Sequence, residues 1–256
     1  MYTTPEVVWL NTNPYLRRFN LPVIKHLSQY LDVAHWEYEL TEDESTSHQL
    51  AIDLLDDYLS LLKKPVHLVG HSTCGFLGLQ YASRYPEKVK SLTLLGVGVN
   101  PAMDWVGYYY LLRRHFKCSQ EVILNHLGRC LFGYGNSYYQ KSLVKLLQKA
   151  LVYSLSPHSL YKRHTSFPVK TITPPLMVCG SREDQIVFWT EIEKWELYLK
   201  TGDRICQCPK GGHFFHYFHP QWLGERILDF WISLGEYIPK KDAYRFNFLT
   251  TSSPNG

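Results

Sequence analysis

The stretch from Val66 to Ala82 constrains the fold of this chain more than any other. It begins with a run that is apolar apart from one histidine, reaches Gly70, presents Ser72, and continues as a helical pattern. This order predicts a strand, a sharp turn and a helix. The serine then stands beside the helix N-terminus, where backbone amides stabilise negative charge. The pattern therefore favours Ser72 as an accessible nucleophile over a buried structural serine.

Apolar strand-like runs alternate with amphipathic helical runs on both sides of the middle of the chain. Few polar residues interrupt the strand-like runs, which is typical of a parallel sheet covered on both faces. We therefore expect the α/β class, with a mostly parallel sheet flanked by helices. The expected strands are 7–10, 33–38, 66–71, 91–96, 174–180 and 204–208, and the expected helices are 21–31, 50–62, 76–82, 191–199 and one that begins at 220.

Residues 101–170 break this alternation and contain no clear buried strand. They carry ten basic and two acidic residues and are rich in aromatic rings, whereas the whole chain has a net charge of only +4. One helix is outlined by apolar residues on one face and by Lys141, Lys145 and Lys149 on another. The favoured interpretation of these lysines is a solvated helix face. The alternative is a basic amphipathic surface that contacts an anionic lipid or an acidic partner.

Composition limits the classes of partner and the compartment. A pI of about 8.6 is mildly basic, and we expect no nucleic-acid partner. The six scattered cysteines indicate free thiols in a reducing compartment, and the single C-x-C pair lacks the second pair that a metal site needs, so no metal is expected. The N-terminal residues resemble no secretory signal, and no apolar stretch is long enough to span a bilayer. We expect a soluble cytoplasmic protein.

The elbow motif resembles that of the α/β-hydrolase family, which reads G-x-S-x-G and often G-H-S-x-G-G. Gly70, His71, Ser72 and Gly75 match this pattern, and Cys74 stands where the family usually has glycine. The family commonly carries a helical cap after the strand that follows the elbow. The resemblance therefore implies a hydrolase core from 1–100 and 171–238, an inserted helical cap over 101–170, and a C-terminal tail over 239–256.

The same resemblance supplies the partners of a Ser-His-Asp triad in the chain order Ser, acid, His. Asp184 begins a D-x-I-V sequence after a late strand, as in the family, and Glu183 beside it is the alternative acid. His213 follows a glycine and precedes Pro220 in the family's G-H-x-x-x-x-x-x-P pattern. His216 and His219 lie nearby in the sequence and rank below His213.

An oxyanion hole needs two donors in this fold. The resemblance implies that one is the backbone N–H of Thr73, directly after the nucleophile. The other is expected from the turn after the first strand, where the family often has His-Gly and this chain has Asn11, Thr12 and Asn13. Asparagine tolerates left-handed backbone, so Thr12 or Asn13 is expected to provide that amide.

The resemblance implies a serine hydrolase that works through an acyl-enzyme and requires no cofactor. Esters, thioesters and lactones all remain open as substrates. The aromatic rings of residues 101–170 favour an apolar acyl group, and their basic excess suits an anionic or amphiphilic one. Two alternatives stay open: a C–C bond hydrolase or lyase with the same triad, and a non-catalytic binding protein in which Cys74 and the Asn11 turn are relics of lost activity.

Overall fold

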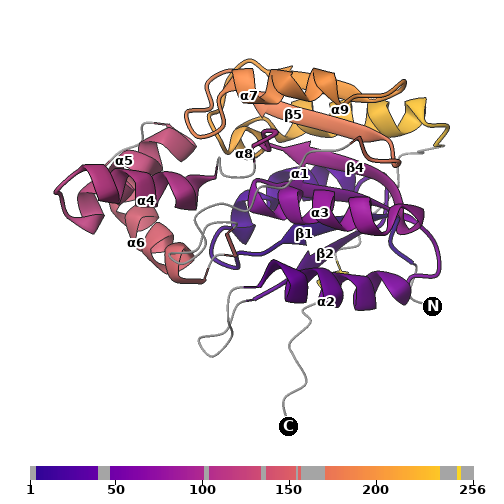
Figure 1. Ribbon diagram of the computed structural model, residues 1–256, viewed down its shortest axis with the longest axis horizontal. Helices are drawn as coiled ribbons and strands as arrows, with labels where there is room; N and C mark the ends of the chain where they lie inside the picture. The colour runs from indigo at the N-terminus through magenta and orange to yellow at the C-terminus, as the bar shows by residue number, and fades with distance from the viewer. Residues whose placement is uncertain are drawn as a thin grey trace, which may run out of the picture.

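In the computed structural model the chain folds around a parallel sheet (Figure 1). The structure describes residues 4–39, 47–100, 104–133, 137–153, 155–156, 171–236 and 247–248. Its strands are β1 (Val7–Asn11), β2 (Val33–Glu37), β3 (Val66–His71), β4 (Val89–Leu95), β5 (Leu176–Ser181), β6 (Arg204–Cys208) and β7 (Asn247–Phe248). The larger helices around the sheet are α1 (Leu21–Leu27), α2 (His48–Ser60), α3 (Thr73–Arg84), α7 (Trp189–Glu193) and α9 (Pro220–Ser233).

The strand order across the sheet is β6-β5-β4-β3-β1-β2-β7, and every neighbouring pair is parallel. Parallel strands place all their carboxyl ends at one edge of the sheet, where ligands of open α/β sheets bind. The loops after β1, β3, β4, β5 and β6 therefore meet at this edge. The expected α/β class with a mostly parallel sheet flanked by helices is confirmed.

Alternate residues of each strand fill two separate apolar cores. Val8 and Leu10 of β1 belong to a large core that includes α2 and α3, while Val7 and Trp9 belong to a second core that includes α1 and α9. These four residues of β1 are completely buried. Both faces of the strand are therefore covered by helices, which explains why its sequence is continuously apolar rather than alternating.

The expected helix boundaries differ from the structure by a few residues, and most at two helices. The helix expected over 21–31 ends at Leu27, because the chain closes into i→i+3 turns at Gln29 and Tyr30. The helix expected over 191–199 is a short α7 followed by a 3-10 turn, Lys194–Leu197. Short elements without an expectation include a 3-10 turn after β1, Arg17–Phe19, and α8, Phe215–Phe218.

Residues 101–170 contain three described helices. They are α4 (Trp105–His115), α5 (Gln120–Phe132) and α6 (Ser137–Tyr153), which lie together at one end of the molecule (Figure 1). Buried side chains from α5 and α6, including Leu127 and Leu147, join the larger core. The limits of the expected cap stay a prediction, because 101–103, 134–136, 154 and 157–170 lie outside the described residues.

The C-terminal segment contributes a short strand to the described structure. Asn247 and Phe248 pair in parallel with Ala34 and His35 of β2. The rest of the expected tail over 239–256 lies outside the described residues. Within the part of the chain that the structure describes, no helix is long and apolar enough to cross a membrane.

Candidate active site

Ser72 lies in the turn between β3 and α3 with backbone angles of φ 53° and ψ −126°. A side chain at such angles costs about 1–3 kcal/mol and is held by its surroundings. Here the strand and the helix touch: a Cβ at Gly70 would lie 2.6 Å from the backbone nitrogen of Gly75. The N–H of Ser72 donates to the carbonyl oxygen of Leu95 at 2.8 Å, which ties the turn to the end of β4. The two glycines thus permit the strained turn that the motif predicts.

Asp184 and His213 form a buried pair at the same edge of the sheet. His213 Nδ1 lies 2.8 Å from Asp184 Oδ2, and the exposed fractions of the two residues are 0% and 2%. The other carboxylate oxygen, Oδ1, accepts the backbone N–H groups of Ile186 and Val187 at 2.8 and 3.0 Å. The carboxylate is therefore fixed on both oxygens. With Nδ1–H donating to it, the Nε2 of His213 carries the lone pair that a general base needs.

The alternative acid, Glu183, is directed elsewhere. Its Oε2 accepts the N–H of Gly211 at 3.0 Å, in the loop that leads to His213. Gly211 and Gly212 in this loop have φ values of 108° and 57°, which glycine adopts without strain. Of the two neighbouring acids, the structure pairs Asp184 with the imidazole, while Glu183 holds the backbone that presents it.

Two further histidines pack behind His213. The ring centroid of His71 lies 4.6 Å from that of His213 and 4.4 Å from that of His216. Burial, with these neighbouring rings as a smaller cause, lowers the pKa of His71 well below its usual value and that of His216 to about 3. Neutral His71 donates Nε2–H to the His213 carbonyl oxygen at 2.9 Å, and neutral His216 donates to Asn20 Oδ1 at 3.0 Å. Of the three rings, His213 is the one paired with a carboxylate.

The structure shows no direct hydrogen bond between the Ser72 hydroxyl and this pair. Both Ser72 Oγ and His213 Nε2 are buried, and neither has a hydrogen-bond partner among the described residues. Leu95, which accepts the Ser72 amide, is followed by Gly96, where a Cβ would lie 3.2 Å from His213 Cε1. Serine–histidine contacts are often long before substrate binds. The structure thus pairs the acid with the histidine through a hydrogen bond and places the serine at the same edge of the sheet.

The turn after β1 is held by side chains. Asn11 Nδ2 donates to Glu37 Oε1 at 2.7 Å, and the other oxygen of Glu37 receives Arg17 at 2.9 Å. Asn11 and Glu37 are both buried, so the hydrogen bond between them is made away from water. Sequence reasoning did not single out Glu37 or Arg17, because the acid ends β2 and reaches this turn only through strand pairing.

Cys74 connects this turn to the elbow helix. The N–H of Thr12 donates to Cys74 Sγ at 3.2 Å, and the Thr12 hydroxyl lies 3.2 Å from the same sulfur. Burial raises the pKa of the Cys74 thiol, so the sulfur is a neutral partner. Of the two residues predicted to offer the second oxyanion donor, Thr12 therefore directs its amide to Cys74. Asn13 lines the adjoining cavity, and its Oδ1 accepts the N–H of Tyr15 at 3.1 Å.

Thr73, the other predicted oxyanion residue, is tied to the helices of 101–170. Its hydroxyl donates to Asp104 Oδ2 at 3.1 Å, and Ser156 donates to the same oxygen at 2.9 Å. Asp104 Oδ1 accepts the N–H of Gly107 at 2.6 Å, which makes Asp104 the N-cap of α4. Sequence reasoning noted Asp104 only as one of two acidic residues among ten basic ones. Its place before a helical pattern was the signal for a cap.

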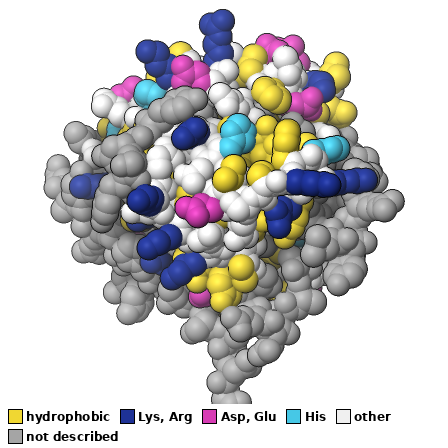
Figure 2. All heavy atoms as spheres, turned by 90° about the vertical axis from the view of Figure 1, so that its left-hand side faces the viewer, with side chains coloured by type: hydrophobic (Ala, Val, Ile, Leu, Met, Phe, Trp, Pro, Cys, Tyr) yellow, Lys and Arg dark blue, Asp and Glu magenta, His cyan; other side chains and the backbone are white. Residues whose placement is uncertain are grey.

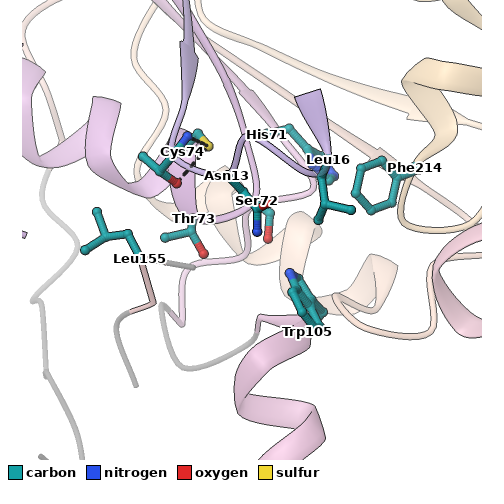
Figure 3. Close-up of a pocket in the computed structure, with 10 residues that line it drawn as sticks. Asn13, Leu16, His71, Ser72, Thr73, Cys74, Trp105, Leu155 and Phe214 are labelled. Carbon is teal, nitrogen blue, oxygen red and sulfur yellow. Dashed lines mark hydrogen bonds between the residues drawn. The ribbon is translucent and has the colours of Figure 1, made fainter. Parts of the chain in front are cut away.

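These residues surround a cavity of about 40 Å³. Figure 3 shows Ser72 and Thr73 with Leu155 on one side, Leu16 and Phe214 on the other, and Trp105 across from them. The cavity has one polar wall, which carries the candidate groups, and apolar walls elsewhere. The lining residues are Thr12, Asn13, Leu16, His71, Ser72, Thr73, Cys74, Trp105, Leu155 and Phe214.

Comparison with known proteins agrees with this geometry. The family model described as the alpha/beta hydrolase fold matches residues 58–107, which include the elbow. An uncharacterized protein of Nostoc sp. (strain PCC 7120) is 42% identical over 93% of this chain and 95% of its own length. The chain belongs to the α/β-hydrolase fold family.

Two solved structures extend the α/β-hydrolase likeness across the chain. Naproxen esterase from Bacillus subtilis superposes with a TM-score of 0.64 at 16% identity and covers 90% of this chain and 85% of its own. A meta-cleavage product hydrolase from Pseudomonas fluorescens IP01 gives 0.63 at 14% identity, with 89% and 90% covered. At such low sequence identities, these structural matches show the shared fold alone. Membership of the α/β-hydrolase family supports a hydrolase, and the family resemblance of the elbow is confirmed.

Proposed function

We propose that this α/β hydrolase is a serine hydrolase that cleaves an ester, thioester or lactone through an acyl-enzyme. The observation that carries the proposal is the buried Asp184–His213 pair at the same edge of the sheet as Ser72. The strained backbone of Ser72 places this residue at a helix N-terminus. A buried imidazole that donates one N–H to a fixed carboxylate is suited to take a proton at its other nitrogen. A fold alone does not supply this chemistry, so the proposal rests on the site.

In the proposed reaction, Ser72 Oγ attacks the acyl carbonyl carbon as its proton passes to His213 Nε2. The carbonyl oxygen becomes an oxyanion, which receives the backbone N–H groups of Thr73 and Asn13. We assign the second donor to Asn13 because the amide of Thr12 is engaged by Cys74. His213 then protonates the leaving alkoxide or thiolate. Water, deprotonated by the same imidazole, releases the carboxylic acid and restores the serine.

The cavity indicates a small apolar acyl group. Its volume of about 40 Å³ lies far below the roughly 300–1,000 Å³ of pockets that enclose drug-sized ligands. Leu16, Trp105 and Phe214 provide apolar walls around the reacting carbonyl. We therefore expect short acyl chains to be turned over faster than long ones, with a larger apolar or amphiphilic leaving group accommodated outside the cavity.

Labelling with a fluorophosphonate tests the nucleophile directly, because the reagent requires an activated serine. Wild type should label, and Ser72→Ala should not. Ser83→Ala is a matched control, since the Ser83 hydroxyl donates to the Leu79 carbonyl on α3 away from the cavity, and it should label as wild type does. A p-nitrophenyl ester series of increasing acyl length should then give its highest kcat/KM for a short chain. A folded wild type that resists the probe contradicts the proposal.

The two alternatives make different predictions for the same experiment. A C–C bond hydrolase, such as the meta-cleavage product hydrolase that shares the fold, would label yet turn over simple esters poorly. A non-catalytic binding protein would not label. Two hydrogen bonds argue against the non-catalytic alternative. Cys74 and Asn11, which depart from the family pattern, both hold in place the turn after β1, residues 11–17, which we call the oxyanion turn.

A further inference from the structure

The lysine row on α6 lacks the exposed apolar stripe that a membrane-bound amphipathic helix needs. Leu143, Leu147 and Ala150, which form the apolar side of this helix, are buried in the core. Lys149 lies over the ring of Tyr15, 5.8 Å from its centroid. An interfacial helix must present its apolar side to the lipid. The favoured interpretation of these lysines as a solvated face therefore agrees with the packing of α6.

Exposed apolar side chains gather instead at the junction of α4 and α5. We call residues 110–122 the α4–α5 tip. Leu111, Phe116 and Val122 within it have exposed fractions of 51%, 58% and 56%. Single exposed apolar residues are common on protein surfaces, whereas these three belong to one short helix–turn–helix segment.

Basic side chains accompany these apolar residues. Arg113, Arg114 and Lys117 are exposed on the same tip, and Glu121 is its one acidic residue. Lys141 and Lys145 of α6 border a surface cleft of about 410 Å³ that also contacts Glu121, so additional positive charge lies beside the tip. Figure 2 faces this end of the molecule and shows groups of apolar side chains interspersed with Lys, Arg, His and a few acidic side chains.

We propose that the α4–α5 tip docks on an anionic lipid surface. Apolar side chains that enter the acyl boundary and cations that meet anionic headgroups are the two requirements for interfacial binding, and the tip supplies both. Charge complementarity favours an anionic membrane over a neutral one. The tip connects to the candidate site through α4, whose first residue, Trp105, lines the cavity. Docking would therefore set the orientation of the cavity relative to the membrane.

Co-sedimentation of the full chain with large lipid vesicles tests this proposal. Wild type should sediment with phosphatidylcholine vesicles that contain phosphatidylglycerol, and much less with phosphatidylcholine alone. The triple variant R113Q/R114Q/K117Q should bind anionic vesicles about 100-fold more weakly, since each cation near the surface contributes roughly fivefold. L111S/F116S should also lose most of its binding, and raised salt should weaken wild type.

Matched controls separate the tip from general surface effects. L61S/L197S removes two apolar side chains that are 76% and 81% exposed but lie outside 101–170, and its binding should equal that of wild type. K141Q/K145Q, whose lysines lie beside the tip, should lose less binding than R113Q/R114Q/K117Q does. Wild type that sediments with neither vesicle, or equally with both, overturns the proposal. So does a larger loss in K141Q/K145Q than in the tip variants, and so does salt-sensitive binding to an acidic protein without vesicle binding.

Fluorophosphonate labelling of each tip variant distinguishes this proposal from the proposed function. The tip residues lie outside the candidate catalytic machinery, so labelling at Ser72 should be unchanged and should also confirm that the variants fold. Loss of vesicle binding with full labelling supports docking by the tip. Absence of labelling in wild type contradicts the hydrolase proposal and leaves the vesicle result to be judged independently.

Discussion

The two sides of the cavity hold their candidate groups by different physical means. On one side, which we call the motif side, lies the elbow between β3 and α3. Gly70 and Gly75 let this strand and helix touch, and the backbone contact supports the strained Ser72. On the other side, in the oxyanion turn of residues 11–17, polar side chains hold the backbone through hydrogen bonds. Asn11 donates to Glu37, and the sulfur of Cys74 accepts the amide N–H of Thr12. Backbone contact needs a particular residue type at each position. A side-chain network needs only compatible partners, so a sequence pattern can change there while the geometry persists.

The largest effect is expected on the motif side, from Asp184→Asn. An asparagine keeps an oxygen for the N–H groups of Ile186 and Val187, but its NH₂ cannot accept from His213 Nδ1–H and favours the wrong tautomer. The rate constant kcat on a short p-nitrophenyl ester should fall about 10⁴-fold, with KM little changed. Glu183→Gln, which keeps an acceptor for the N–H of Gly211, should stay within a few-fold of wild type. Equal losses in the two variants would show that the acid has been misassigned.

An intermediate effect, on stability, is expected from His216. Its ring packs on His71 of β3 and donates a hydrogen bond to Asn20, which precedes α1. Its pKa falls from 6.5 in the unfolded chain to about 3 in the folded one, chiefly through burial. Between these values the unfolded state binds more protons, so stability is full above about pH 6.5 and is lost as pH falls. The loss is roughly 1.4 kcal/mol per pH unit.

Urea unfolding at pH 7 and pH 5 measures this contribution. Replacing His216 with Gln removes the titrating ring and should make the fall in unfolding free energy between the two pH values smaller by about 2 kcal/mol. Asn20→Ala leaves the ring in place and should lower stability by a similar amount at both pH values. If His216→Gln retains the full wild-type dependence on pH, the ring does not stay neutral in the folded protein.

The smallest effect is expected at the oxyanion turn, from Cys74→Ala. Loss of the sulfur frees the amide of Thr12 and loosens the turn without deleting a donor, so kcat/KM should fall about 10-fold, short of the roughly 10²–10³ for a lost oxyanion donor. The effect should lie in kcat, with the melting temperature nearly unchanged. Cys74→Ser, which keeps an acceptor, should recover part of the rate. Full activity in Cys74→Ala would mean that the turn stands without the sulfur.

Predictions from the sequence were most accurate for features that depend on residues close together in the chain. Most of the main strands follow from largely apolar runs, with β6 (Arg204–Cys208) the exception, and the elbow follows from the strand, glycine and serine order. The positions of Asp184 and His213 came from motifs that follow strands, and parallel pairing then brought the two strand ends to one edge. Helix ends were less accurate, because the last turn of α1 depends on i→i+3 closure that the apolar period does not encode.

Contacts between distant segments were beyond the sequence. Thr12 and Cys74 lie 62 positions apart, and Thr73 and Asp104 lie 31 apart. Their pairing depends on how strands and helices pack. The sequence shows only that Cys74 departs from the glycine of the family pattern, whereas the structure shows that its sulfur accepts a hydrogen bond from Thr12. The choice between Asp184 and Glu183 had the same character, since neighbours in sequence point in different directions.

The sequence by itself determined the α/β class and the elbow with its serine, because each depends on residue type and short-range periodicity. The chain order of the candidate serine, acid and histidine came from the family resemblance. The tertiary structure decided which acid meets the histidine, what holds the oxyanion turn, and which surface of residues 101–170 is exposed. The lysine row of α6 and the α4–α5 tip each carry three Lys or Arg residues in sequence. Only packing shows that the apolar residues beside the lysine row are buried and those of the tip are not.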